Sequence, residues 1–206
     1  MLEIINATIN LGGKQLFNGL NITAKEGETV CLRGNSGCGK TTLLRAILGF
    51  MPLDNGNISI DGEPITAESA EVFRQMMSYI PQELSLPSDD VKDMVKLPFT
   101  LRVNRDKKYS KAALMAEWKK LGLTEDLYDK KVAQLSGGQR QRIMIAVSGL
   151  LGKKVILADE PTSALDATSS TLVADYFQTL ASKGAIIIAV SHDNNFAEKC
   201  SKIINL

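Results

Sequence analysis

The octapeptide that decides the fold of this chain reads Gly34-Asn35-Ser36-Gly37-Cys38-Gly39-Lys40-Thr41 and fits the pattern G-x-x-x-x-G-K-[ST]. Its glycines let the backbone turn with several N–H groups pointing inward, which makes a concave nest for phosphate oxygens. A helix that begins at the end of this loop adds the positive end of its dipole. Lys40 can place a full positive charge on the β- and γ-phosphates, and the Thr41 hydroxyl can ligate magnesium. We therefore predict that residues 34–41 bind a nucleotide with Mg²⁺.

Two further groups stand at the ends of apolar runs that read as strands. Asp159 and Glu160 follow Val155-Ile156-Leu157-Ala158, where the carboxyl end of a parallel strand meets ligands. We expect Asp159 to support magnesium and Glu160 to polarise an attacking water as the catalytic base. The other interpretation of this pair is a solvated strand end. His192 follows a second apolar run, and its imidazole could hydrogen-bond the γ-phosphate or the water, although a histidine after a strand is more often a surface or capping residue.

The pattern around these groups predicts an α/β fold. Strands are expected at residues 2–9, 20–24, 29–32 and 57–60, and a helix at 41–50. Residues 91–131 have charged helical patterning, the single Trp118 and an interruption at Pro98, which indicates an inserted helical lobe. Helices at 138–151, 167–183 and 194–199 then alternate with strands at 154–158 and 185–190. This alternation predicts a mainly parallel core sheet covered on both faces, with antiparallel strands at the N-terminus.

Composition sets limits on the class of protein. The chain has 206 residues, 44% of them hydrophobic, and a formal net charge of +1. It therefore has enough apolar residues for a real core, and nothing in its overall charge points to nucleic acid or an anionic membrane surface. We expect no membrane span and no signal peptide, because the apolar runs are short and the start lacks a basic leader. The three cysteines, Cys31, Cys38 and Cys200, show no CxxC spacing and suit a reducing compartment.

The pentapeptide Leu135-Ser136-Gly137-Gly138-Gln139 points to a particular family. In physical terms it is a helix N-terminus with a serine cap and two glycines, which makes a second anion site. One nucleotide does not need two such sites from one chain. The sequence resembles the signature motif of ABC ATPases, which closes over ATP held by a partner subunit. Tyr79-Ile80-Pro81-Gln82 is similar to the Q-loop of that family, and Ser163-Ala164-Leu165-Asp166 is similar to its D-loop.

This resemblance covers essentially the whole chain and implies a role for each motif. Gly34 to Thr42, with Thr42 the last residue of the loop, are expected to cradle the phosphates. Gln82 and Asp159 resemble the contacts to magnesium and water, and Lys40, Gln82, Glu160 and His192 resemble the catalytic set. Ser136, Gly138 and Gln139 are expected to act on the ATP of the opposite subunit, with Ser136 and Gly138 at its γ-phosphate. Asp166 is expected where two subunits communicate, and residues 89–101 are similar to the surface that receives membrane partners. The family implies one ABC ATPase domain over residues 1–206, with a core at 1–88 and 153–206 and the helical lobe at about 89–152.

The function implied is that of the ATP-hydrolysing motor subunit of an ABC transporter. We expect a second copy of the chain and an integral membrane permease as partners, no nucleic acid, and a place on the cytoplasmic face of the inner membrane. The alternative is a soluble ABC ATPase that acts on protein or nucleic-acid complexes without a permease; such relatives usually carry two ATPase domains or a long coiled-coil insertion. A nucleotide kinase with the same phosphate loop leaves residues 135–139 without a role.

One position departs from the family pattern. Relatives often carry an aromatic residue after the first strand, where it stacks on adenine. Here the sequence Asn10-Leu11-Gly12-Gly13 puts Leu11 at that place, and Phe17 is nearby but out of register. We therefore expect the adenine to be held without strong stacking.

Overall fold

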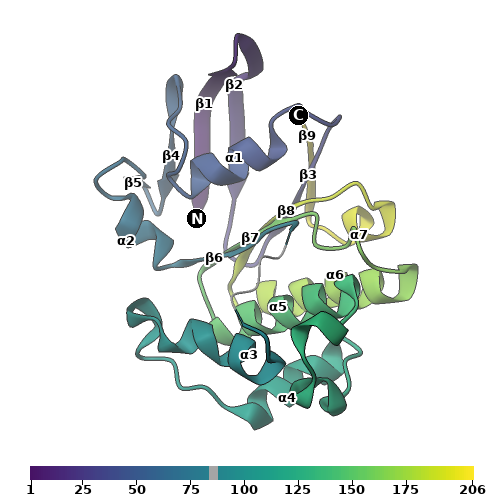
Figure 1. Ribbon diagram of the computed structural model, residues 1–206. Coiled ribbons are helices and arrows are strands. Elements are labelled where there is room, and N and C mark those ends of the chain that lie inside the picture. The colour runs from purple at the N-terminus through teal and green to yellow at the C-terminus, as the bar shows by residue number, and fades with distance from the viewer. Residues whose placement is uncertain (84–87) are drawn as a thin grey trace.

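The computed structural model describes residues 1–83 and 88–206, and a parallel sheet runs through its middle (Figure 1). This sheet has five strands in the order β6-β7-β8-β3-β9, every neighbouring pair being parallel. Their bounds are β3 Thr29–Arg33, β6 Met77–Ile80, β7 Val155–Asp159, β8 Ile186–Val190 and β9 Lys202–Asn205. Parallel strands end at the same edge of a sheet, so the residues that follow β3, β6, β7 and β8 come together there.

The side chains of the central strands alternate between two hydrophobic clusters, one on each face of the sheet. In β7, Ile156 and Ala158 belong to one cluster, while Val155 and Leu157 belong to the other. All five residues of β7 and all five of β8 are buried. This is the pattern expected of a parallel sheet covered on both sides, and it explains why these strands read as continuous apolar runs.

A separate antiparallel sheet of four strands, in the order β2-β1-β4-β5, packs over one of these faces together with helix α1. The bounds are β1 Leu2–Leu11, β2 Lys14–Ala24, β4 Asn55–Ile60, β5 Glu63–Pro64 and α1 Lys40–Ile47. Gly12 and Gly13 join β1 to β2 with φ angles of 58° and 79°. A two-residue hairpin turn of this hand needs positive φ at both positions, which glycine adopts without strain.

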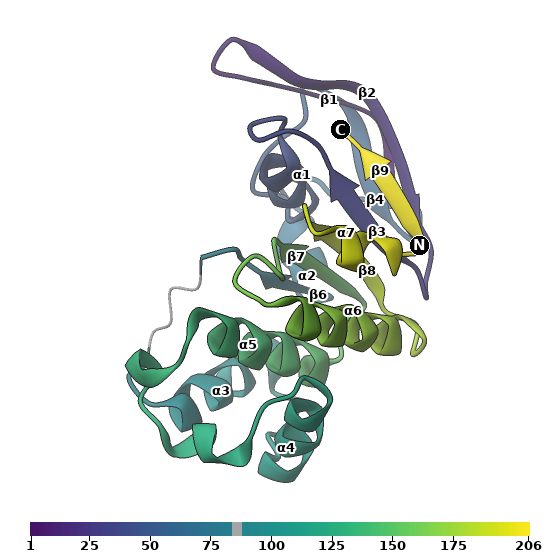
Figure 2. The same cartoon turned by 90° about the vertical axis from the view of Figure 1, so that its right-hand side faces the viewer.

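The other face of the parallel sheet is covered by helices. The long ones are α5 Gly137–Leu151 and α6 Ala167–Ala181, with the short α7 Asn194–Glu198 beside them. The helical lobe adds α3 Val91–Thr100 and α4 Lys111–Lys120, with single 3-10 turns at Arg102–Asn104, Glu125–Asp129 and Val132–Gln134. Helix α2 Ala70–Arg74 lies on the core just before β6. Figure 2 shows the antiparallel sheet at one end of the molecule and the helical lobe at the other.

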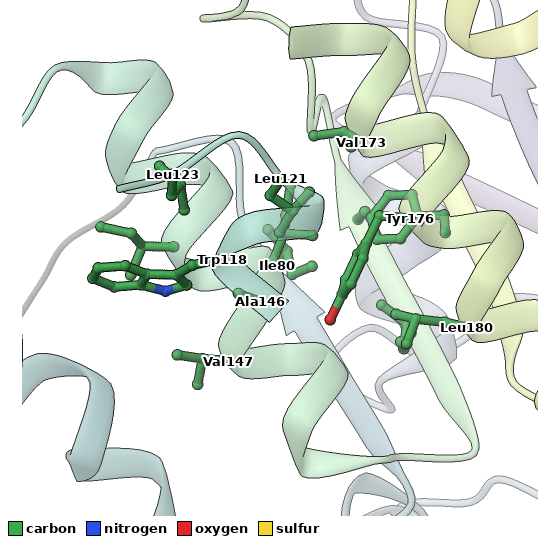
Figure 3. Packing of buried hydrophobic residues seen from close by; sticks show 14 of the residues in the cluster. Ile80, Trp118, Leu121, Leu123, Ala146, Val147, Val173, Tyr176 and Leu180 are labelled. Atoms are coloured by element: carbon green, nitrogen blue, oxygen red, sulfur yellow. The ribbon is translucent and has the colours of Figure 1, made fainter. Parts of the chain in front are cut away.

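One cluster of buried side chains ties the lobe to the core. It runs from Trp118 of α4 and Leu121 just after that helix through Ala146 and Val147 of α5 to Ile80 at the end of β6 (Figure 3). Trp118 is 1% exposed. The lobe is therefore packed through α5 on the same apolar core as the sheet.

The predicted fold class is confirmed, and the differences lie in single elements. Strands β6 and β9 are absent from the sequence-based assignment, and β2 begins at Lys14 where the alternation predicted residue 20. Pro98 does not interrupt the lobe; it lies inside α3, two residues before the helix ends. Pro98 lacks the N–H that would bond the Met94 carbonyl oxygen, so the helix loses that one bond and ends two residues later. In the described parts of the chain, no helix is both long and apolar enough to cross a bilayer.

Candidate functional site

The predicted phosphate loop connects β3 to α1 at the carboxyl edge of the parallel sheet. Gly37 and Gly39 have φ angles of 76° and 104°, and Gly39 stands at the N-cap of α1 in a left-handed conformation. Gly34 has a φ of 155°, and a Cβ built there would come within 2.6 Å of the Cys38 sulfur. These positions need glycine for the backbone path and for the close approach of the loop to itself.

Lys40 is the first residue of α1, and its ammonium group lies against the loop. The side chain is 7% exposed, and Nζ donates hydrogen bonds to the carbonyl oxygens of Gly34 at 2.8 Å and Asn35 at 3.1 Å. A buried cation beside inward-facing N–H groups and a helix N-terminus gives the loop a strong attraction for anions.

Asp159, at the end of β7, faces this loop. Thr41 Oγ1 donates to Asp159 Oδ2 at 2.8 Å, and the Tyr79 hydroxyl lies 3.5 Å from the same oxygen. Asp159 is 3% exposed, and its Oδ1 atom has no hydrogen-bond partner among the residues that the structure describes. A buried carboxylate oxygen without a donor is costly unless a cation or a water completes its environment.

Glu160 follows Asp159 in an unusual backbone conformation. Its φ angle is 49°, and its N–H donates to the carbonyl oxygen of Val190 at 2.9 Å. A glutamate at positive φ is strained by about 1–3 kcal/mol, and such strain concentrates at functional sites. The turn aims the carboxylate at His192, whose Nε2 lies 3.4 Å from Glu160 Oε1. Burial raises the pKa of the Glu160 carboxyl above its ordinary value, and the nearby His192 opposes part of that rise.

These groups line one cavity of about 620 Å³ at the carboxyl edge of the sheet. The predicted residues that line it are Ser36, Gly37, Gly39, Lys40, Thr41, Thr42, Gln82, Asp159, Glu160 and His192. Gly34, Asn35 and Cys38 belong to the same loop, set back from the cavity wall. Gln82 is exposed on the segment that leaves β6. The predicted phosphate, carboxylate and histidine groups are thus brought together.

Sequence reasoning missed four residues that line the same cavity, namely Leu16, Thr162, Val190 and Asp193, and it gave Ser163 only as part of the segment similar to a D-loop. Thr162 and Ser163 follow Glu160 in the loop after β7, and Asp193 follows His192. Their place beside predicted site residues at the ends of parallel strands was the signal that could have found them. Leu16 carries no such signal, because its place depends on the pairing of β2 with β1.

The signature segment lies outside this cavity. Ser136 is exposed at the N-cap of α5, and its Oγ accepts a hydrogen bond from the Gln139 N–H at 3.1 Å. The Gln139 side chain accepts in return from the Ser136 N–H at 2.9 Å, so the pair forms a capping box. The Gln139 amide is therefore engaged with its own helix.

Gly138 is buried against the loop that leads to α6. A Cβ built at Gly138 would lie 2.8 Å from the Ala164 carbonyl oxygen and 2.8 Å from Leu165 Cδ2. Asp166, at the end of that loop, caps α6 by accepting from the Ser169 N–H at 2.7 Å. The signature and the segment similar to a D-loop therefore pack against each other within one chain.

Leu11 lies at the end of β1 and lines the cavity with 48% of its surface exposed. Phe17, the nearby aromatic residue, is only 9% exposed and belongs to the core cluster under the antiparallel sheet. An aliphatic side chain is therefore exposed in the cavity here, while the aromatic ring is committed to packing.

We predict that this wall gives weak discrimination between bases. Base stacking on an aromatic residue contributes about 1–3 kcal/mol, of which leucine recovers only the part due to apolar burial. GTP should be hydrolysed almost as well as ATP, and Leu11→Tyr should tighten ATP binding by up to about tenfold. Titration of both proteins with ATP and GTP measures this. Ile5→Tyr, on an exposed position of the same strand, is the control; a strong ATP preference in the wild type without a gain from Leu11→Tyr contradicts the prediction.

The three cysteines offer a second check on the loop. Cys38 is half-buried, with its sulfur 4.0 Å from Lys40 Nζ, and Cys31 is fully buried in β3. We predict that an alkylating reagent modifies Cys38 in the free protein and that ATP protects it. Mass spectrometry of the labelled peptides measures the modification of Cys31, Cys38 and the half-buried Cys200 in one sample. The labelling of Cys200 should not change when ATP is added. Equal labelling of Cys38 with and without nucleotide places it away from the phosphates.

The loop, the buried lysine and the carboxylates at the strand ends define a nucleoside-triphosphatase site of the phosphate-loop type. The model of the family described as "ABC transporter" matches residues 17–163. The chain belongs to this family, and it is an ATP-binding protein and an ATPase.

Relatives and solved structures agree with this assignment. Over its whole length the chain is 29% identical to 91% of "Probable iron export ATP-binding protein FetA" of Escherichia coli (strain K12). Over 94% of its length it is 36% identical to 74% of "Taurine import ATP-binding protein TauB" of Escherichia coli O157:H7. It also superposes, with a TM-score of 0.84, 29% identity and coverage of 100% of this chain and 94% of the other, on the dimeric post-hydrolysis state of the ATP-binding cassette MJ0796 bound to ADP and Pi.

Proposed function

We propose that two copies of this chain close on Mg-ATP and drive a separate membrane permease from the cytoplasmic face of the inner membrane. The division of the site into two parts supports the dimer. Lys40 and Glu160 line the cavity, whereas the capped, exposed N-terminus of α5 at Ser136 lies outside it. A second copy that presents its Ser136 to the open cavity completes the γ-phosphate contacts. The related cassette bound to ADP and Pi is itself a dimer.

Magnesium fits the cavity by the chemistry of its donors. The Thr41 hydroxyl and the unpartnered Asp159 Oδ1 are hard oxygen ligands, the kind that Mg²⁺ prefers. In the described residues, no cluster of three or more His, Cys, Asp or Glu side chains could hold a metal. Mg²⁺ commonly takes one or two protein oxygens and completes its shell with phosphates and water. Thr41 and Asp159, with Gln82 at the rim, would hold it there, where it would neutralise charge on the β- and γ-phosphates.

The chain's own residues supply the rest of the hydrolysis. Lys40 holds positive charge at the phosphates, where negative charge spreads during transfer. Glu160 accepts a hydrogen bond from the attacking water and orients it, and its half-buried place keeps that interaction strong. His192, beside Glu160, is placed to steady the water or the γ-phosphate.

The observation that carries the permease assignment is a concentration of exposed apolar side chains around one groove. A cavity of about 260 Å³ lies between the core and the lobe, lined by Tyr79, Pro98, Leu101, Val103 and Met144 among others. Of the large hydrophobic residues that are exposed, Leu101 and Val103 line this cavity, while Val72 on α2, Met76 just before β6 and Leu97 on α3 lie on the elements that border it. Such a surface indicates a protein-interaction site when it is contiguous, and an apolar segment of a permease suits it. We call it the docking groove.

The named relatives favour a transporter over a permease-free ATPase. FetA is named as an export subunit and TauB as an import subunit, at identities of 29% and 36%. Since subunits of both directions resemble this chain to a similar degree, we propose that the permease sets the cargo and its direction.

The proposal is tested by capturing the tagged chain from detergent-solubilised membranes. The wild type should retain a multi-span membrane protein encoded beside it, and Val72→Asp/Leu101→Asp should lose it with ATPase activity unchanged. Ile203→Asp, at an exposed apolar position on β9, is the matched control and should capture the permease normally. Capture by the groove variant at the wild-type level contradicts the proposed docking surface.

A further inference from the structure

The connection from α3 to α4 carries a local excess of positive charge that the nearly neutral chain conceals. Residues 101–111 include five cationic side chains and one acidic side chain, namely Arg102, Arg105, Lys107, Lys108, Lys111 and Asp106. Two of the cations are engaged: Lys107 Nζ lies 3.8 Å from Asp106 Oδ2, and Lys111 Nζ lies 4.2 Å from the centre of the Tyr128 ring.

The other three cations, Arg102, Arg105 and Lys108, are exposed. Within residues 1–83 and 88–206, no ion pair and no side-chain hydrogen bond is formed by any of them. Charges that fold stability does not use are free to bind a partner of opposite sign.

Two exposed aliphatic side chains stand between these cations. Leu101 is 49% exposed and Val103 is 39% exposed, on either side of Arg102. The backbone that displays them is held by Asn104, which is 3% exposed. Its Nδ2 donates to the Pro98 carbonyl oxygen at 2.8 Å, and its backbone N–H donates to the Leu101 carbonyl oxygen at 2.8 Å. The segment 101–108, which we call the basic turn, therefore carries two exposed aliphatic side chains beside its cations, on a backbone that Asn104 holds in place.

The basic turn lies at the rim of the docking groove. A second cavity of about 560 Å³ is lined by Glu71 and Gln75 from the α2 region and by Arg102, Val103, Arg105 and Asp106 from the turn. Leu101 and Val103 also line the docking groove itself. Figure 1 shows α2 above the helices of the lobe, on the side where these two parts meet. A permease seated in the groove therefore has the basic turn beside it.

We propose that the basic turn binds the anionic phospholipid headgroups of the membrane around the permease. This inference rests on the proposed docking, because a permease in the groove brings this face toward the membrane. Clustered Lys and Arg side chains are attracted to acidic lipids by roughly 1 kcal/mol each near the surface. On vesicles without a permease the groove is empty, and Leu101 and Val103 are then free to add shallow apolar burial at the headgroup level, a contact that lipid offers and nucleic-acid phosphates do not.

The test uses the full chain and vesicles without a permease. Vesicles of phosphatidylcholine with or without phosphatidylglycerol are sedimented with the protein at low and at physiological salt. The wild type should bind only the vesicles that contain phosphatidylglycerol, and salt should weaken the binding. Arg102→Gln/Arg105→Gln should lower the affinity by about tenfold or more at low salt, with the ATPase rate unchanged. Lys25→Gln/Lys183→Gln removes the same charge from exposed positions on other elements and should bind like the wild type.

Several outcomes overturn the proposal. They are a wild type that ignores phosphatidylglycerol at low salt, equal binding to both kinds of vesicle, and an arginine variant that binds like the wild type. Another such outcome is an arginine variant that fails to capture the permease from membranes but still binds the vesicles that contain phosphatidylglycerol. In that case the basic turn binds an acidic segment of the permease, and the assignment to lipid is wrong. The capture and the vesicle assays are independent, so a failure of docking is distinguished from a failure of lipid binding.

Discussion

Lys40→Ala is expected to abolish ATP hydrolysis and to weaken nucleotide binding. The substitution removes the buried ammonium group that lies 2.8 Å from the Gly34 carbonyl oxygen at the centre of the phosphate loop. In the proposed Mg-ATP complex that charge faces the β- and γ-phosphates, where negative charge develops during transfer. Loss of one such preorganised interaction costs a factor of about 10²–10³ in turnover. Phosphate release under saturating Mg-ATP and equilibrium binding of a fluorescent ATP analogue measure the two effects.

A neighbouring lysine provides the control. Lys14 reaches the outside of the same loop, with Nζ 3.3 Å from the Gly37 carbonyl oxygen, but it is exposed. Solvent and salt screen its charge, so Lys14→Ala should keep most of the turnover. Turnover at the wild-type rate in Lys40→Ala would contradict the assignment of this loop as the phosphate-binding loop.

Glu160→Gln should leave ATP binding intact and stop turnover, because an amide cannot accept the proton of the water. The substitution keeps the size of the side chain and the backbone conformation at φ 49°. ATP that is bound but not hydrolysed should then hold two chains together. Size-exclusion chromatography with ATP, with and without magnesium, should show a shift from monomer to dimer, and phosphate release should fall by a factor of about 10² or more.

The same variant allows a sharp test of the signature helix. Ser136→Asp, made in the Glu160→Gln background, keeps a good N-cap for α5 but adds a negative charge where the γ-phosphate of the second copy is expected. The double variant should bind ATP as a monomer with an unchanged melting temperature. If the double variant forms the dimer as readily as Glu160→Gln alone, α5 does not face the nucleotide. A Glu160→Gln protein that stays monomeric at every ATP concentration puts the two-copy model itself in doubt.

The strands that could be predicted from the sequence are those in which every residue has the same kind of environment. Strands β7 and β8 are buried on both faces, so every position is apolar and the run is plain to see. Strand β9 lies at the edge of the sheet with exposed residues at every second place, and β6 is only partly buried in its middle. Four residues of that kind carry too little pattern, and their strand state depends on pairing with β3 and β7.

The first half of β2 shows a different limit. Its pairing with β1 has register shifts between Ala7 and Asn10, so the side chains do not keep a period of two. Bulges of this kind come from the fit of the two strands to each other, which local sequence does not record.

The candidate site shows the same contrast between residues that a local sequence pattern marks and residues that only the tertiary structure places. Side chains fixed by a backbone motif, such as Lys40, or by the end of an apolar strand, such as Asp159, could be assigned from the sequence. The positive φ of Glu160 could not, because the sequence preference of glutamate runs against it and the surrounding loop imposes it. Leu16 reaches the cavity through the hairpin and likewise gives no local signal.

The contact of Gly138 with Ala164 changes how a mutational screen of this protein should be interpreted. A Cβ at position 138 would lie 2.8 Å from the Ala164 carbonyl oxygen, so the two backbones must shift apart, and we expect a loss of activity there whatever the nucleotide does. Gly137 is exposed, and a Cβ added there lies at an ordinary 3.6 Å from the Ala164 Cβ. Position 137 is therefore the informative glycine: intolerance of alanine there reports a partner that approaches the backbone, while intolerance at position 138 reports the interior of the chain itself.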